Sequence, residues 1–379
     1  MSEPLFRDSP RTRTVRRLCE WIEQGILPAG QPLPTERELA ERLDLPRSTV
    51  ARAIDAVIAR GLVRSDGGHA RIVVGPQRAG TLAGTVVVVG HPIDEAVEPD
   101  APAYAELTTL GVLAELRAQS LDALVLDARR SDVASLLRLV EQGVAGVLVP
   151  AGSGRPRIDP EAMRDCLLAI AARGVPAVIF GDESGEGVDR VASDHEAGAD
   201  AATALLLARG RIRPLQIFGD ATDLVWCRQR RAGYERAMRR AGLEPLPPLL
   251  VPNLPADSLS SSDPDRHARH LLGYLFDWLG PQAASPADAL VLLTDHEAEP
   301  VRRACALLGC APDMVGYDAA VGAWAAGRRW DPAPLTASVD KRLWRCGQEM
   351  VRLMQWRQEL GRDPAPRRVA LEPLLVTAS

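Results

Sequence analysis

The apolar positions of the first 75 residues recur at helical spacing in three short segments. The predicted helices cover residues 11–24, 35–43 and 47–60, and the second opens with Thr35-Glu36-Arg37-Glu38, the sequence of a capping box. Two short strand patterns follow at 62–64 and 71–74, with the hairpin turn Asp66-Gly67-Gly68 between them. Helix, helix, turn, helix and hairpin is the plan of an α+β winged helix-turn-helix, predicted here for residues 1–75.

The pattern changes after a predicted linker at 76–83, which is rich in glycine and small residues. Short apolar runs without polar alternation are now separated by helical patterns, which indicates a parallel sheet covered on both faces. The predicted strands are Thr85–Val89, Ala123–Leu126, Gly146–Val149, Ala177–Phe180, Leu215–Phe218, Ala289–Leu293 and Met314–Gly316. The predicted helices lie near 104–118, 131–142, 160–173, 196–209, 227–241, 264–279 and 297–308. We expect a two-lobed α/β domain over 84–379.

The charge distribution separates these two parts. The whole chain of 379 residues carries a formal net charge of −5, which by itself argues against a nucleic-acid partner. Residues 1–78, however, hold 13 arginines against 10 acidic residues, a net charge of +3, and the remainder carries −8. A small basic module is therefore joined to a larger acidic one, which keeps DNA binding open for the N-terminal part.

Several protein classes are disfavoured by composition. No run of 18 apolar residues is present, and the N-terminus lacks the apolar core of a signal peptide, so we expect a cytoplasmic protein without a membrane partner. The six cysteines are scattered, which predicts reduced, packed thiols. We expect no cofactor and no metal. Asp194-His195 and Asp295-His296-Glu297 are the clusters that invite a catalytic or metal site, and helix capping explains both more simply.

An α/β enzyme and a solute-binding protein remain the alternatives. Against the enzyme, the sequence has no Gly-rich phosphate loop and no nucleophile elbow. Against the solute-binding protein, that class needs an export signal and has no use for residues 11–75.

The stretch 33–63 resembles the DNA-binding domain of GntR-type regulators, and the resemblance covers about residues 11–75. The motifs that carry the resemblance are Leu33-Pro34-Thr35-Glu36-Arg37-Glu38-Leu39-Ala40 and Arg47-Ser48-Thr49-Val50. The resemblance implies a double-stranded DNA operator as partner, with the third helix in the major groove and the wing in the adjacent minor groove. The candidate DNA-binding residues are Arg37, Arg47, Ser48, Thr49, Arg52 and His69. A solvated helix face is the alternative for the arginines.

One position of this head departs from the resembled family. GntR-type heads usually carry arginine where this sequence has Ala51, and the wing lacks the usual lysine. The operator sequence of relatives therefore does not transfer to this chain.

The region 84–379 resembles the sensor of LacI/GalR-type repressors, a type I periplasmic-binding-protein fold. Seven motifs carry the resemblance in order: Pro102–Glu106, Gly143–Val149, Arg173–Val178, Arg228–Tyr234, Thr294-Asp295, Val315–Asp318, and Leu335-Thr336 with Val339. A GntR-type head on such a sensor resembles the arabinose-repressor group. The resemblance implies a repressor that works as a homodimer and binds a small-molecule effector between the lobes.

The resemblance also implies four effector-binding residues, namely Tyr104, Arg230, Asp295 and Asp318. Tyr104 has the alternative of a core position, Arg230 that of a solvated residue in an arginine-rich run, and Asp318 that of a helix cap. A carbohydrate is the effector that the family implies. The loop 251–262 offers no aromatic side chain to stack on a sugar ring, so a smaller or more polar effector stays open.

Overall fold

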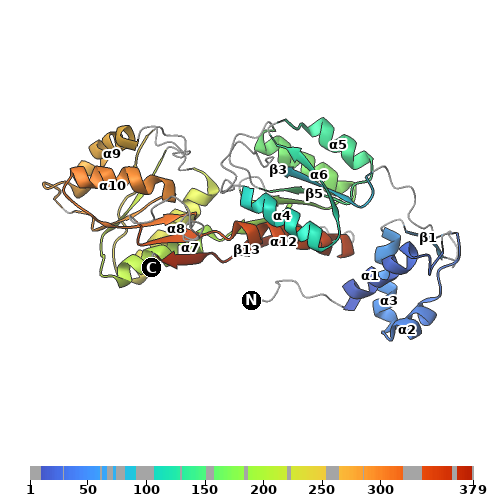
Figure 1. Ribbon diagram of the computed structural model, residues 1–379. Helices are drawn as coiled ribbons and strands as arrows, with labels where there is room; N and C mark the ends of the chain where they lie inside the picture. The colour runs from blue at the N-terminus through green and yellow to red at the C-terminus, as the bar shows by residue number, and fades with distance from the viewer. Residues whose placement is uncertain are drawn as a thin grey trace. The chain divides into compact units, whose positions relative to one another are not determined.

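The computed structural model describes most of the chain (Figure 1). The described residues are 10–28, 30–59, 62–65, 71–73, 82–90, 106–128, 130–150, 158–182, 187–219, 223–252, 264–284, 286–318, 335–360 and 365–377. His69, Tyr104, residues 76–81 of the predicted linker and residues 253–262 of the predicted loop lie outside them.

The N-terminal head contains the three predicted helices, α1 (Pro10–Glu23), α2 (Glu36–Leu43) and α3 (Arg47–Ala59). Thr35 caps α2 in the predicted capping box: its hydroxyl accepts from the Glu38 backbone N–H, and the Glu38 carboxylate accepts from the Thr35 backbone N–H at 2.8 Å. Asp44 ends α2 in a left-handed conformation, with φ +53°. The helices enclose an apolar core that includes Val15, Leu18, Ile22, Leu39, Val50, Ile54 and Val57.

A small antiparallel sheet completes the head. Strands β1 (Val63–Ser65) and β2 (Arg71–Val73) pair with Val63 opposite Val73. On its other side β2 is bonded to the segment before α2, because the Leu33 backbone N–H donates to the Arg71 carbonyl at 2.6 Å. The wing is therefore fixed to the helix-turn-helix along one whole strand.

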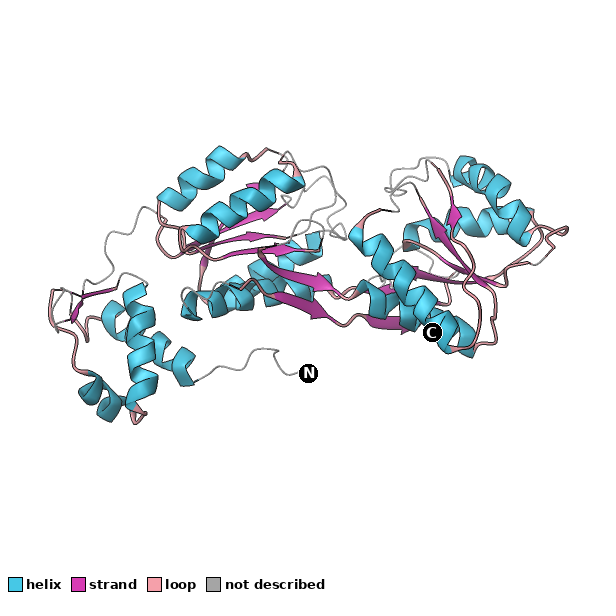
Figure 2. Cartoon of the chain, turned by 180° about the vertical axis from the view of Figure 1, so that it is seen from behind, coloured by secondary structure: helices cyan, strands magenta, loops and turns pink. Residues whose placement is uncertain are grey.

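The rest of the chain contains two six-stranded sheets with helices packed on them (Figure 2). The chain divides into two compact units: Met1–Phe180, Ser184–Arg190 and Gly347–Arg368 form the first, and Gly181–Glu183, Val191–Cys346 and Val369–Ser379 form the second. The division falls inside two strands and one long helix, so the chain passes between the units several times.

The first sheet has the strand order β13-β7-β6-β5-β3-β4. Its strands are β3 (Thr85–Gly90), β4 (Asp122–Asp127), β5 (Gly146–Val149), β6 (Ala177–Phe180), β7 (Asp189–Ser193) and β13 (Arg368–Leu371). Its helices are α4 (Glu106–Ala118), α5 (Val133–Glu141), α6 (Pro160–Ala172) and α12 (Leu343–Leu360). Helices α5 and α6 pack on one face through Leu136 and Leu167. The other face holds α12, where Met354 contacts the backbone at Gly146.

The second sheet has the strand order β14-β12-β11-β10-β8-β9. Its strands are β8 (Pro214–Phe218), β9 (Leu249–Leu250), β10 (Ala289–Val291), β11 (Asp313–Tyr317), β12 (Ala337–Asp340) and β14 (Leu374–Thr377). Helices α9 (Pro264–Leu279) and α10 (Ala298–Leu307), after the short 3₁₀ helix η2 (Asp295–Glu297), cover one face. Helices α7 (His195–Ala208) and α8 (Val225–Arg240) cover the other.

The predicted α/β pattern is confirmed, with two differences. All seven predicted strands and all seven predicted helices of 84–379 are present, within a few residues of their expected ends. The sequence pattern missed β7, β9, β12, β13, β14 and α12. The second sheet is also not wholly parallel, because β14 pairs antiparallel with β12.

None of the helices among the described residues is long and apolar enough to span a membrane. Within the same residues, no group of three or more His, Cys, Asp or Glu side chains is arranged to hold a metal ion. All six cysteines are free thiols, and five of them are buried.

Candidate functional site

The outer face of α3 carries most of the side chains that the sequence assigns to DNA. Arg47 is the first residue of this helix, and Arg47, Ser48 and Arg52 are exposed, whereas Thr49 is half-buried. The opposite face of α3 is the apolar core of the head. A helix with one buried face and a polar, cationic outer face is what major-groove recognition requires.

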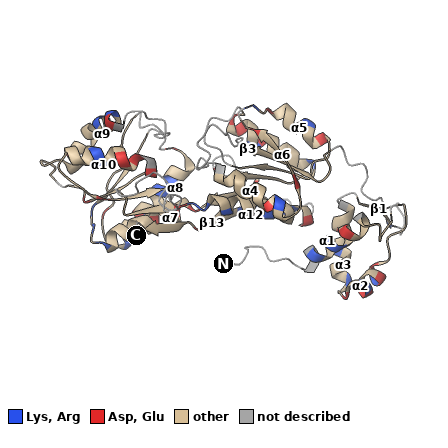
Figure 3. Ribbon diagram, in the orientation of Figure 1, with Lys and Arg blue, Asp and Glu red and all other residues tan. Residues whose placement is uncertain are grey.

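Arg37 of α2 lies near the start of α3. Arg37 and Arg47 line one shallow surface depression together with the turn Asp44–Pro46. Both arginines therefore lie on the same side of the helix-turn-helix, and Figure 3 marks the charged positions along the ribbon of these helices. Ala51, where the resembled heads carry arginine, is half-buried.

The wing is attached to α2 through an ion pair. Arg71 Nη1 lies 2.8 Å from Glu36 Oε1, and both side chains are about 30% exposed, at 31% and 28%. Because Glu36 is the first residue of α2, this pair ties strand β2 to the helix that precedes the recognition helix.

The second unit brings polar residues to the carboxyl ends of its parallel strands. The segment Leu293–Glu297 follows β10, Asp318 follows β11, and Lys341 follows β12. In open α/β sheets this edge is where ligands bind. We call Arg230, Glu297, Asp318 and Lys341 the edge cluster.

Arg230 is a fixed member of the edge cluster. It lies on α8 and is only 4% exposed. The alternative of a solvated arginine is therefore wrong for Arg230. Its guanidinium stacks 3.7 Å from the ring centre of Tyr317 and 4.6 Å from that of Trp226. It donates to the Leu293 carbonyl and, at 3.4 Å, to His195 Nδ1. Two aromatic rings and two acceptors hold the charge in one place.

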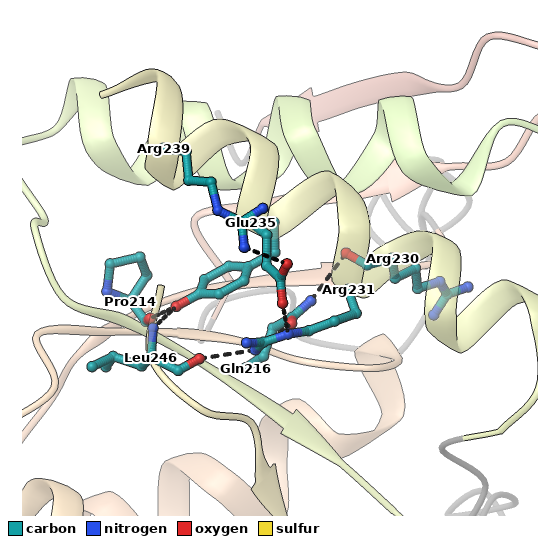
Figure 4. Close-up of polar contacts among 8 residues, drawn as sticks. Pro214, Gln216, Arg230, Arg231, Glu235, Arg239 and Leu246 are labelled. Atoms are coloured by element: carbon teal, nitrogen blue, oxygen red, sulfur yellow. Dashed lines mark hydrogen bonds and ion pairs between the residues drawn. The ribbon is translucent and has the colours of Figure 1, made fainter. Parts of the chain in front are cut away.

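The neighbouring Arg231 does something different, as Figure 4 shows. Arg231 Nε donates to Glu235 Oε1 at 2.6 Å, and Arg231 Nη1 donates to the Leu246 carbonyl at 2.9 Å. The Tyr234 hydroxyl completes the network by donating to the Pro214 carbonyl at 2.8 Å. Arg231 thus ties α8 to the segment before β9, and Tyr234 ties α8 to strand β8, whereas the Arg230 side chain leaves the helix away from this network.

Asp318 and Lys341 form an ion pair within the edge cluster. Lys341 Nζ lies 3.0 Å from Asp318 Oδ1, with 16% of the lysine side chain and 10% of the aspartate side chain exposed. Asp318 has a φ of +99°, in a region that favours glycine, and its backbone N–H donates to the Val339 carbonyl at 2.9 Å. Burial lowers the pKa of Lys341, while the Asp318 carboxylate acts in the opposite direction and Arg230 lowers the pKa further. A strained backbone conformation such as that of Asp318 is common at functional sites.

Glu297 is fully enclosed beside these charges. Burial raises the pKa of Glu297 to about 8, although its carboxylate accepts from the Leu293 backbone N–H at 3.2 Å and feels the Arg230 charge. Its carboxyl group is therefore mostly protonated near neutral pH. Within the edge cluster, Asp318 is then the acid that is paired with a cation, Lys341.

Asp295, by contrast, supports this edge from inside. Its side chain is completely buried, and the Ser338 hydroxyl lies 2.8 Å from Asp295 Oδ1 and 2.7 Å from Oδ2. The sequence placed Asp295 at the ligand-facing edge, and the structure places its carboxylate between β11 and β12. Asp194, from the other acidic cluster, caps α7 by accepting from the Ala197 backbone N–H at 2.9 Å, as predicted.

Sequence reasoning missed Lys341, Trp226 and the role of Glu297. Lys341 carried a signal, because it is the one lysine among the 45 basic residues of the chain. Glu297 lay in the cluster that capping was expected to explain. His195 lay in a cluster that the sequence analysis assigned to helix capping, and its contacts with Trp226, Arg230 and Tyr317 join three separate segments, α7, α8 and β11.

Comparison with known proteins identifies the head. Residues 10–73 match the family of bacterial regulatory proteins known as the gntR family. This match covers the helices and the wing strands described above, and it confirms the resemblance of the head. No curated protein matches the chain.

Solved structures of transcription regulators share the fold of the larger part. The complex of the transcriptional regulator CelR with cellobiose is 24% identical over 91% of this chain and 99% of its own, with a TM-score of 0.56. A candidate LacI-family regulator from Sanguibacter keddieii is 26% identical over 78% and 98%, with a TM-score of 0.52. A LacI-family regulatory protein from Chloroflexus aggregans is 19% identical over 77% and 97%, with a TM-score of 0.57.

These findings define a DNA-binding regulator with a head and a sensor. Residues 10–73 are a gntR-family DNA-binding domain, and the remaining chain has the fold of LacI-family regulators.

Proposed function

We propose that this protein is a transcription repressor that binds operator DNA as a homodimer and whose DNA affinity changes when a small molecule binds at the edge cluster. The observation that carries the proposal is the exposed polar face of α3, with Arg47, Ser48 and Arg52 opposite a buried apolar face, in a segment that matches gntR-family heads. Two such heads related by a two-fold axis fit a palindromic operator.

Each head residue has an expected role. Arg47, at the start of α3, would read a guanine edge through two hydrogen bonds, and Ser48, Thr49 and Arg52 would contact neighbouring bases or phosphates. Arg37, beside Arg47, would hold a phosphate. His69 belongs to the proposed wing contact.

The effector would be held by Arg230 and Asp318, with Tyr104 as a proposed apolar wall. CelR has been solved with cellobiose, which supports a small polar ligand for this fold. A ligand changes DNA affinity only by the difference between its affinities for the two conformations of the regulator. The alternative of an α/β enzyme has less support, since the structural neighbours are regulators.

DNA binding is tested with the full chain and fragments from the region upstream of its own gene. We expect protection of a palindromic site and a steep loss of affinity with salt, because phosphate contacts release counterions. Arg47→Ala should weaken binding by about 1–3 kcal/mol. Arg164→Ala is the matched control, because Arg164 lies on α6 and pairs at the surface with Asp165. Absence of specific binding to any genomic fragment would refute the proposal.

A further inference from the structure

We propose that the effector carries an anionic group, a carboxylate or a phosphate, and that Lys341 selects for it. This inference rests on the proposed function, because it concerns the ligand of the same edge cluster. It adds a residue that the resemblance to LacI-type sensors does not supply.

Lys341 occupies an unusual position in this chain. Forty-four of the 45 basic residues are arginine, and the one lysine directly follows β12 at the carboxyl edge of the second sheet. Its ammonium is largely buried and pairs with Asp318 at 3.0 Å. A lysine presents a compact point charge where an arginine presents a planar fork, so the two side chains select different partners.

The second observation is the balance of charge in the edge cluster. The Arg230 charge lowers the pKa of Lys341, and Asp318 pairs with Lys341 at 3.0 Å. Glu297, whose pKa is about 8, brings a proton rather than a negative charge near neutral pH. Two further acids of the described chain have other partners, since Asp194 caps α7 and Asp295 accepts from Ser338. Among its four residues, the edge cluster therefore holds two cations, Arg230 and Lys341, and one carboxylate that is paired with Lys341.

Neutral and anionic ligands differ in how well they offset the charge of such a cluster. A neutral sugar hydroxyl is satisfied by an amide or hydroxyl side chain, without the cost of burying an ammonium. An anionic group offsets that cost, because it neutralises the excess charge where water is largely excluded. Arg230 is held between Tyr317 and Trp226 and so offers its charge at a fixed place beside Lys341.

The experiment uses the full chain and matched sets of ligands. Each set contains a neutral sugar, its carboxylate and its phosphate ester, such as glucose, gluconate and glucose 6-phosphate, with corresponding sets built on galactose, arabinose and ribose. Binding is measured by calorimetry and by the shift in thermal unfolding. We expect an acid to bind and its neutral counterpart not to bind, and the carboxylate and phosphate arms identify the group.

Three variants test the residue. Lys341→Gln should weaken binding of the acid about tenfold to hundredfold, as expected for the loss of a hydrogen bond to a charged group. Lys341→Arg keeps the charge and should retain much of the affinity. Arg209→Gln is the matched control, because it removes one positive charge beside Asp313 at the amino end of β11 and should leave binding unchanged.

A second measurement needs no variant. Because Lys341 is the one lysine, acetylation followed by mass spectrometry of its peptide reports on that amine alone, with the N-terminal amine as an internal control. Gluconate or glucose 6-phosphate should slow acetylation of Lys341, and glucose should not.

Two results would overturn the inference. One is a neutral sugar that binds equally well to the wild-type protein and to Lys341→Gln, which would make Lys341 a structural partner of Asp318. The other is the absence of binding by every acid in a preparation that still binds operator DNA. Both leave the proposed DNA-binding function intact, whereas that function fails only in the separate DNA experiment.

Discussion

The backbone of Gly316 lies directly against the carboxylate of Asp295. A Cβ built on Gly316 would overlap Asp295 Oδ1, so β11 has no room for a side chain at this position. The close approach brings the end of β11 beside the segment that follows β10. Asp318 lies two residues after Gly316. Glycine at 316 is therefore a condition for the geometry of the edge cluster.

Gly316→Ala should destabilise the protein by about 1–3 kcal/mol, because the added methyl forces the buried carboxylate or the strand to move. The change is measured as the shift in thermal or urea unfolding. Gly273→Ala is the matched control, since Gly273 is exposed on α9 and a Cβ there would meet nothing within 4 Å. The free energy of unfolding of the control variant should rise by up to about 1 kcal/mol, because alanine has a higher helix propensity than glycine. Equal effects of the two substitutions would contradict the packing explanation.

Asp189→Asn should destabilise the first unit by about 3–5 kcal/mol, because it breaks a buried ion pair while Arg357 keeps its charge. Asp189 is 6% exposed and accepts from Arg357 Nε at 2.6 Å and from the Arg367 backbone N–H at 2.7 Å. The comparison is Asp165→Asn, whose carboxylate is 68% exposed and pairs with Arg164 at the surface. That substitution should cost about 1 kcal/mol or less. Chemical unfolding followed by circular dichroism measures both.

Glu297 should make the second unit less stable as the pH rises. The folded state keeps a proton on Glu297 up to a pKa of about 8, whereas the unfolded chain releases it near 4.5. The stabilisation is therefore complete below 4.5 and is lost as the pH rises through 8, with a slope of at most about 1.4 kcal/mol per pH unit.

The measurement for Glu297 is the unfolding midpoint of wild-type and Glu297→Gln proteins between pH 5 and pH 9. The difference between them should grow in favour of the glutamine variant as the pH rises. Glu299→Gln serves as control, because hydrogen bonds from Arg302 and Arg303 lower the pKa of Glu299, so its effect should appear at acidic pH. A wild-type profile parallel to that of Glu297→Gln would disprove the assignment.

Thr35→Ala should lower the free energy of opening of the first turn of α2 by about 1 kcal/mol. The reason is that the Thr35 hydroxyl accepts from the Glu38 backbone N–H at 3.3 Å. Hydrogen exchange of the first α2 amides in the full chain measures the effect. Thr35→Ser keeps the hydroxyl and should restore protection. Identical exchange in the alanine and serine variants would show that the capping box does not limit opening of this helix.

The head was predicted nearly completely from sequence because its signals are local. The capping box, the turn at Asp44 and the three apolar helix faces are encoded within a few residues of where they act. What the sequence did not give is the link between Arg71 and Glu36, which are 35 positions apart.

Local sequence patterns predicted some strands of the two sheets and missed others. The buried central strands were predicted because apolar runs without polar alternation are typical of them. Strand β4 was found although it lies at an edge, but β13 and β14 were missed, since a short edge strand has the same sequence pattern as a loop. Helix α12 was missed although it has 18 residues, and it packs against α4 at Gly347, where a Cβ would overlap the Thr108 carbonyl.

The sequence by itself determined the winged helix-turn-helix and the residues that face outward from α3, since helical periodicity fixes which side chains share a face. It also determined the order of the seven strands and seven helices that it predicted along the sensor. Only the tertiary structure decided that Arg230, which the resemblance had named, is buried against Tyr317, and that Lys341 pairs with Asp318. The reason is that parallel strands bring together carboxyl ends that lie far apart in the chain, and burial then sets the charge of each group gathered there.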